Sequence, residues 1–376
     1  MKIREFGLER IQSLYENTVD YNLTESGFHP FSLQELLTQE QLEELINLTL
    51  GYGQTNGAIP LRQLIADQLY TDMDADNIMV TNGSAEANFI AMHTLLQAGD
   101  EVVIMKPNYM QIWGAVEEMG CTPKAFDLRR ENNWASDIDE IKAVVSDKTK
   151  LIAVCNPNNP TGYVLSDAEM KEIVSIAESV GAWIYSDEVY RGAELNHQES
   201  TSFQELYDKV VVSGGLSKAY ALPGIRMGWL AGPETEIYNT WSYHDYTSIS
   251  TGIVSQYIAG IALSESKRIE ILTRNRDMLN TNLKFLQSWI DEHGALFDFV
   301  PPKAGGMAFM KYKLDINSTE LSTWLREQES VFVVPGDCYG MDGFIRIGVG
   351  ERPDYLNEGL TKMSKAIVER FKLSVR

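Results

Sequence analysis

The sequence has 376 residues, of which 32 are Lys or Arg and 53 are Asp or Glu, so the formal net charge is −21. A surface of this sign repels nucleic-acid phosphates and anionic membranes, so we exclude both as partners. With 44% hydrophobic and 23% charged residues, the chain has the composition of a folded globular protein that can fill a sizeable core.

The cysteines and the N-terminal residues indicate the cellular compartment. Cys121, Cys155 and Cys338 lie far apart and form no C-x-x-C pair, which fits neither a disulfide framework nor a thiolate metal site. The N-terminal residues are charged and lack an apolar segment of signal-peptide length, and no run of about 18 apolar residues occurs. We therefore expect a cytoplasmic protein without a bound metal.

The first 45 residues have little strand signal and contain the loop Leu23–Pro30, so we predict an N-terminal arm that joins a smaller domain. From residue 46 to 270, apolar runs rich in β-formers alternate with helical patterns, which is typical of a largely parallel sheet covered by helices. Helices are expected at Ser84–Leu96 and after a capping box formed by Ser166 and Glu169. The predicted strands are Asn77–Thr81, Glu101–Met105, Leu151–Cys155, Ala182–Ser186, Val210–Ser213 and Met227–Ala231.

The C-terminal part, residues 271–376, has the pattern of a second and smaller α+β domain. A long helical pattern over Ser264–His293 leads into it and could bridge the two domains. Its predicted strands and helices are Met307–Tyr312, Ser318–Arg326, Val331–Val334, Phe344–Val349 and Tyr355–Phe371. The fold class is therefore α/β, with domain boundaries near residues 45 and 270.

One lysine, Lys218, stands in a glycine-bounded turn after a predicted strand, within the segment from Ser213 to Trp229. A lysine amine forms a Schiff base with an aldehyde when its surroundings lower its pKa. Arg226, eight residues further on, could supply a neighbouring cation and a fork for phosphate oxygens. A surface lysine near an arginine at a strand start is the alternative.

Three other segments also follow predicted strands. Asn159 lies in the loop NPNNPTG, where its amide would face the crevice in which α/β sheets bind ligands, although a plain turn has the same composition. Asp187 ends an apolar strand and could hold a proton on a heterocyclic nitrogen, or could be a helix cap. Gly83, Ser84 and Ala85 open a helix whose backbone N–H groups suit a phosphate.

These segments share one place in the predicted architecture, the carboxyl edge of the sheet. An aldehyde-binding lysine, a carboxylate, an amide, an arginine and an anion-binding helix start are the partners that pyridoxal 5′-phosphate (PLP) requires. We therefore predict PLP as the cofactor.

With these motifs in this order, the chain resembles the fold-type I PLP enzymes, the class I/II aminotransferases of the aspartate aminotransferase superfamily, over nearly its whole length. The resemblance implies a large domain with a mostly parallel seven-stranded sheet flanked by helices. It also implies that Lys218 carries the Schiff base and moves the substrate's α-proton. The cofactor partners that it implies are Asp187 for the ring nitrogen, Asn159 and Tyr190 for the phenolic oxygen, Tyr109 for the ring face, and Gly83, Ser84, Ala85 and Arg226 for the phosphate.

The resemblance extends to the substrate and to a second subunit. Arg346, in the segment FIRIG, matches the arginine that binds the substrate's α-carboxylate, and Gly27 matches a backbone that passes over the substrate. Tyr52, in GYGQTNG, matches a tyrosine lent to the neighbouring subunit's phosphate, which implies a homodimer with shared active sites. Arg346 could instead be a surface arginine, and Tyr52 and Tyr109 could be core aromatics.

The chain departs from the family pattern in two ways. Many relatives carry a serine three residues before the lysine, where this sequence has Gly215, so Ser217, backbone or water would replace one phosphate contact. No second arginine for a distal carboxylate is evident, which argues against aspartate as the preferred substrate.

The predicted function is transfer of an amino group from an L-amino acid to a 2-oxo acid. A C–S lyase or an amino-acid cyclase or synthase of the same fold would use the same residues and is the alternative. A non-catalytic effector-binding regulator is disfavoured because Lys218 is present and the charge opposes DNA. A nicotinamide-dependent dehydrogenase is disfavoured because no G-x-G-x-x-G follows an early strand.

Overall fold

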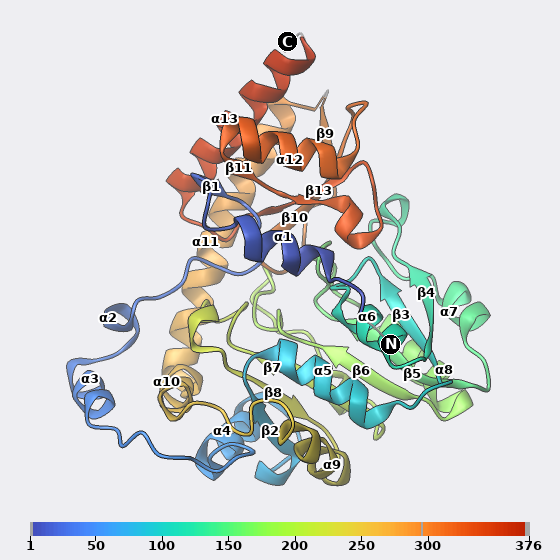
Figure 1. Ribbon diagram of the computed structural model, residues 1–376, viewed down its shortest axis with the longest axis vertical. Helices are drawn as coiled ribbons and strands as arrows, with labels where there is room; N and C mark the ends of the chain where they lie inside the picture. Colours follow the sequence, from blue (N-terminus) through green and yellow to red (C-terminus); the bar gives the residue numbers. More distant parts are fainter. Residues whose placement is uncertain (1–2, 295, 373–376) are drawn as a thin grey trace.

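A seven-stranded sheet lies in the lower part of the view of the computed structural model in Figure 1, and the structure describes residues 3–294 and 296–372. Its strand order is β2-β8-β7-β6-β5-β3-β4, and only β8 runs antiparallel to its neighbours. The predicted α/β fold with a mostly parallel sheet is therefore confirmed. The strands are β2 (Ile78–Thr81), β3 (Glu101–Lys106), β4 (Thr122–Asp127), β5 (Thr149–Cys155), β6 (Trp183–Asp187), β7 (Val210–Gly215) and β8 (Gly228–Ala231).

Within this sheet, sequence patterning missed β4, which lies at one edge. Its sequence, TPKAFD, includes a proline and a lysine, and only Phe126 is buried. Edge strands carry such residues because one side of the strand has no neighbour to hydrogen-bond. The period of two that marks a buried strand is consequently absent.

Helices cover both faces of the sheet, which explains why its central strands are apolar on both sides. Along β3, Val102 and Ile104 pack in one core together with α5, α6 and α9, while Val103 and Met105 pack in a second core with the helices of the other face. The predicted capping box is present, because Ser166 accepts a hydrogen bond from the backbone of the third residue of α8. The helices around the sheet are α4 (Ile59–Leu69), α5 (Ser84–Leu95), α6 (Gln111–Glu118), α7 (Ile138–Val144), α8 (Asp167–Val180), α9 (Glu234–His244) and α10 (Ile253–Leu263).

The predicted long helix is α11 (Glu265–Glu292), whose 28 residues span about 42 Å. Asn275 donates its side-chain amide to the carbonyl of Ala219, next to Lys218. Two turns later, Asn282 donates to the carbonyl of Val349 in the C-terminal part of the chain. One helix therefore links the two parts of the fold that contain Lys218 and Arg346.

The C-terminal part contains a four-stranded antiparallel sheet in the order β12-β13-β10-β9. The N-terminal segment packs with it, since β1 (Tyr21–Asn22) pairs with β11 (Val331–Phe332). The single strand expected at 331–334 is two short strands, β11 and β12, which belong to different sheets. The domain boundaries near residues 45 and 270 stay a prediction. The remaining elements are α1 (Gly7–Tyr15), α2 (Leu33–Leu36), α3 (Gln39–Ile46), β9 (Phe297–Phe299), β10 (Met307–Tyr312), α12 (Ser318–Glu329), β12 (Val334–Pro335), β13 (Phe344–Gly348) and α13 (Pro353–Phe371).

Within the part of the chain that the structure describes, no helix combines the length and the apolar character needed to cross a membrane.

Candidate active site

One cavity of about 280 Å³ is lined by most of the site residues predicted from the sequence. It lies where the carboxyl ends of the parallel strands meet the N-terminal segment and β13. Residues that are distant in the sequence therefore line the same cavity. Ten of the thirteen predicted site residues line it: Ser84, Ala85, Tyr109, Asn159, Asp187, Tyr190, Ser217, Lys218, Arg226 and Arg346.

The other three predicted residues lie outside the lining. Gly83 has φ +81°, and a Cβ there would collide with the guanidinium of Arg226, so only glycine allows this close approach. A Cβ on Gly27 would lie 3.5 Å from the Cα of Lys218, which shows that the N-terminal segment passes directly over the lysine. Tyr52 is 87% exposed and does not reach the cavity of its own chain.

Lys218 lies in the turn after β7 and lines the cavity. Its side chain is only 29% exposed, so the amine does not lie in bulk solvent. The Nζ atom lies 3.6 Å from Oε2 of Glu25. The positive charge of Lys218 holds the pKa of Glu25 below its usual range. Sequence patterning did not predict Glu25 as a site residue, because it lies in a loop without periodicity.

Asp187 is buried at the end of β6 and accepts a hydrogen bond from the backbone N–H of Val189 at 3.3 Å. Asn88 donates its amide to the other carboxylate oxygen at 3.4 Å and accepts a bond from the Tyr185 hydroxyl. Burial raises the pKa of Asp187 to about 6. Asn88 was not predicted, although its position one helical turn after Ser84 places both residues on the same face of α5.

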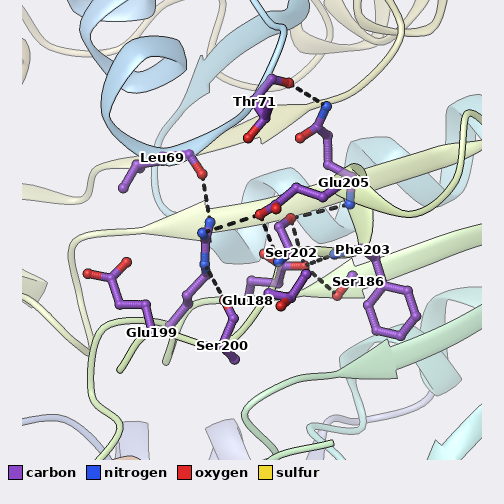
Figure 2. A network of polar contacts seen from close by, with 12 residues as sticks. Leu69, Thr71, Ser186, Glu188, Glu199, Ser200, Ser202, Phe203 and Glu205 are labelled. Atoms are coloured by element: carbon purple, nitrogen blue, oxygen red, sulfur yellow. Dashed lines mark hydrogen bonds and ion pairs between the residues drawn. The ribbon is translucent and has the colours of Figure 1, made fainter. Parts of the chain in front are cut away.

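The chain segment that follows Asp187 is anchored by a buried polar network (Figure 2). One carboxylate oxygen of Glu188 accepts hydrogen bonds from the Ser186 and Ser202 hydroxyls and from the backbone N–H of Phe203. Burial raises the pKa of Glu188. Because Glu188 is fixed in this way, the backbone on either side of it holds Asp187 and Tyr190 toward the cavity.

Arg346, on β13, is only 2% exposed and lines the cavity. Its Nη1 donates to Oδ1 of Asn159 at 2.9 Å, and its Nη2 donates to the carbonyl of Thr24. Its buried Nε has no hydrogen-bond partner among the described residues. A buried guanidinium with an unused donor is suited to a carboxylate ligand. The alternative of a surface strand arginine is therefore wrong.

The positively charged end of the cavity lies at the N-terminus of α5. The first N–H groups of the helix, including those of Ser84 and Ala85, have no partner within the helix. Arg226 lies against Gly83, and its Nη1 is 3.3 Å from the hydroxyl of Ser217. This combination of helix N-terminus, guanidinium and hydroxyl fits a phosphate group.

The aromatic wall of the cavity is Tyr109, whose ring contacts Phe6 in an edge arrangement at 4.9 Å between centroids. Its hydroxyl donates to Glu9 of α1 at 2.7 Å. Burial raises the pKa of Tyr109 well above its usual value, so the phenol stays protonated. The N-terminal helix therefore fixes the orientation of this ring.

Comparison with known proteins confirms the resemblance. The sequence model of the family described as aminotransferase class I and II matches residues 21–362. Capreomycidine synthase of Streptomyces vinaceus is 28% identical over 351 residues, which cover 92% of this chain and 89% of that protein. Aspartate aminotransferase of Pyrococcus abyssi is 28% identical over 344 residues, 88% of each chain. The crystal structure of a PLP-dependent aminotransferase from Streptococcus suis 89-1591 superposes with a TM-score of 0.93 and 32% identity over 100% of both chains.

The pH dependence of stability tests the buried state of Asp187. Because its pKa is about 6 when folded and 3.8 ordinarily, the folded state binds this proton more tightly than the unfolded chain. The stability from the protonated carboxyl is greatest at low pH and is lost as the pH rises through the folded pKa. The free energy of unfolding of Asp187→Asn, relative to wild type, should therefore increase by about 1 kcal/mol between roughly pH 5 and pH 8. Urea titrations of the ligand-free proteins measure it, and a difference independent of pH would contradict the buried carboxyl.

Proposed function

The chain belongs to the class I and II aminotransferase family, whose cofactor is PLP, and we propose that it transfers an amino group from an L-amino acid to a 2-oxo acid. The observation that carries the proposal is the convergence of Lys218, Asp187, Arg226 and Arg346 on one cavity. These four side chains match the aldehyde, the ring nitrogen, the phosphate and the substrate carboxylate in charge and chemistry.

The residues present fit PLP. The glycine at position 83 leaves room for Arg226 beside the helix N-terminus, as a phosphate site requires. Asp187 is a buried carboxylate that a cationic ring nitrogen would stabilise in its ionised form. The proposed assignments are Lys218 for the aldehyde, Asp187 for the ring nitrogen, Asn159 and Tyr190 for the phenolic oxygen, Tyr109 for the ring face, and Gly83, Ser84, Ala85, Ser217 and Arg226 for the phosphate.

When bound, PLP supplies an aldehyde that reacts with amino groups and a ring that accepts electrons from the substrate's α-carbon. Arg346 binds the α-carboxylate and, with the backbone at Gly27, orients the α-carbon toward Lys218. The Lys218 amine acts as the general base that takes the α-proton and later returns it. Asp187 keeps a proton on the ring nitrogen and so favours the flow of charge into the ring.

We propose a homodimer in which Tyr52 contacts the phosphate bound in the neighbouring subunit. Ile46, Leu50 and Tyr52 are between 78% and 87% exposed, and Tyr246, after α9, is 91% exposed. The two segments lie side by side, because Trp241 donates its indole N–H to Thr55. Exposed apolar side chains gathered in this way support an interface with a second copy. A cytoplasmic location, supported by the cysteine usage, is part of the same proposal.

A synthase of the same fold is the second candidate function. Capreomycidine synthase matches this chain at the same 28% identity as an aspartate aminotransferase does. A C–S lyase would also use the residues named here.

Product analysis separates these candidates. For an aminotransferase, a panel of amino acids incubated with 2-oxoglutarate or pyruvate should yield one new amino acid for each donor consumed. Chromatography of the products and an ammonia assay measure this ratio. Release of ammonia and pyruvate from cysteine-type donors would instead indicate a lyase, and a ring-closed product would indicate a synthase.

Replacement of the lysine tests the covalent role. Borohydride reduction of the wild-type holoenzyme should add the mass of the reduced cofactor to the peptide that contains Lys218. Lys218→Ala should bind PLP without this adduct and should lose at least about 10³-fold in turnover, because the general base is removed. Mass spectrometry of the peptides measures the adduct. An adduct on another lysine would contradict the assignment.

Replacement of Gly83 tests the phosphate site. In Gly83→Ala, the new methyl group collides with the guanidinium of Arg226 and the residue must keep φ +81°, so we expect PLP affinity to fall about tenfold or more. Gly114→Ala is the control, since a Cβ on this α6 residue meets no atom within 4 Å. Fluorescence titration of the cofactor-free proteins measures both, and equal affinities would count against the site.

A further inference from the structure

Three carboxylates that have no role in the proposed function line the active-site cavity. Glu9 lies on α1, Glu16 directly follows that helix, and Glu25 lies in the loop after β1. All three come from the N-terminal segment, which passes over Lys218. They form one acidic wall, opposite the sheet edge that carries the cofactor residues.

The three carboxylates differ in their hydrogen-bond and ion-pair partners. Glu9 accepts a hydrogen bond from the Tyr109 hydroxyl, and Glu25 pairs with Lys218 at 3.6 Å. In residues 3–294 and 296–372, the Glu16 carboxylate has neither a hydrogen-bond nor an ion-pair partner. Burial and repulsion from Glu25 and Glu9 raise the pKa of Glu16. A cation placed beside Glu16 would relieve this repulsion.

A second observation in the same cavity points to a ligand. The buried Nε of Arg346 is an unused donor, and the chemistry that fits it is a carboxylate. The other cations of the lining in the described chain are Lys218 and Arg226, which the aldehyde and the phosphate occupy in the proposed function. Among the lining residues of this chain, a second carboxylate on the substrate would therefore meet the acidic wall and not a cation.

We propose that the amino donor is an L-amino acid with a cationic side chain, an ammonium or a guanidinium, bound with its α-carboxylate at Arg346 and its distal cation among Glu9, Glu16 and Glu25. This inference rests on the proposed function and names its substrate class. Glu16 is the main contact, because its carboxylate is the least engaged of the three.

Binding of unreactive acids to the holoenzyme tests the inference without turnover. 5-Guanidinopentanoate carries a carboxylate and a guanidinium but no α-amino group, and 5-ureidopentanoate is its neutral counterpart of nearly equal shape. Calorimetric titration should show that the guanidinium acid binds about tenfold more tightly. In steady-state assays, L-arginine should likewise exceed L-citrulline in kcat/KM, and L-lysine should exceed L-norleucine.

A charge-neutral variant identifies the wall. Glu16→Gln should reduce the preference for the guanidinium acid about fivefold to tenfold, with the affinity for the ureido acid unchanged. Glu5→Gln is the matched control, because it removes the same charge from the same segment at a side chain that is 72% exposed and outside the cavity lining. It should leave both affinities as in the wild type.

The outcomes separate this inference from the proposed function. Equal affinity for the two acids, or a preference that Glu16→Gln does not change, overturns the inference even if the enzyme transfers amino groups. A protein that prefers the guanidinium acid in a Glu16-dependent manner but forms no new amino acid supports the cationic substrate class and overturns the transferase assignment.

Discussion

The position of the Lys218 amine depends on a turn that is fixed from three sides. Leu216 donates its backbone N–H to the carbonyl of Met227, and Ala219 donates to the carbonyl of Val189 just beyond β6. From α11, Asn275 donates its side-chain amide to Ala219. These bonds connect the residues around Lys218 to the chain next to β8 and β6 and to the long helix, so the turn is held at the carboxyl edge of the sheet.

The same edge of the sheet also holds two buried carboxyl groups, and burial disfavours their charged forms. Asp187 and Glu188 are adjacent, both are buried, and burial raises the pKa of each. One oxygen of Glu188 accepts three hydrogen bonds, while its other oxygen is buried without a partner among the described residues. Each oxygen of Asp187 accepts one long hydrogen bond, from Val189 or from Asn88. Because Asp187 lines the cavity and Glu188 does not, a cationic ligand bound in the cavity would stabilise the charged form of Asp187.

Much of this arrangement follows from the sequence, because parallel strands covered on both faces leave clear apolar runs, and polar residues directly after them must meet at one edge. Lys218, Asp187 and Asn159 are predicted in this way, and Arg226 follows Lys218 in the loop that leads to β8. The edge strand β4 was missed, since a half-exposed strand with proline and lysine lacks the pattern. Glu25 was missed because its position depends on long-range packing of an irregular loop, and no local signal records such contacts. Asn88 is predictable from helical spacing, because it lies four residues after Ser84 on the same face of α5.

We propose that the Lys218 amine holds PLP between Asp187 and Arg226, in a site that a second subunit completes. A crystal structure of the holoenzyme tests it most directly. Continuous density from the Lys218 Nζ to the cofactor is expected, with Asp187 at the ring nitrogen, Arg226 at the phosphate and Tyr52 of the partner subunit beside that phosphate. A cofactor bound away from Lys218, or a phosphate remote from Arg226, would contradict it.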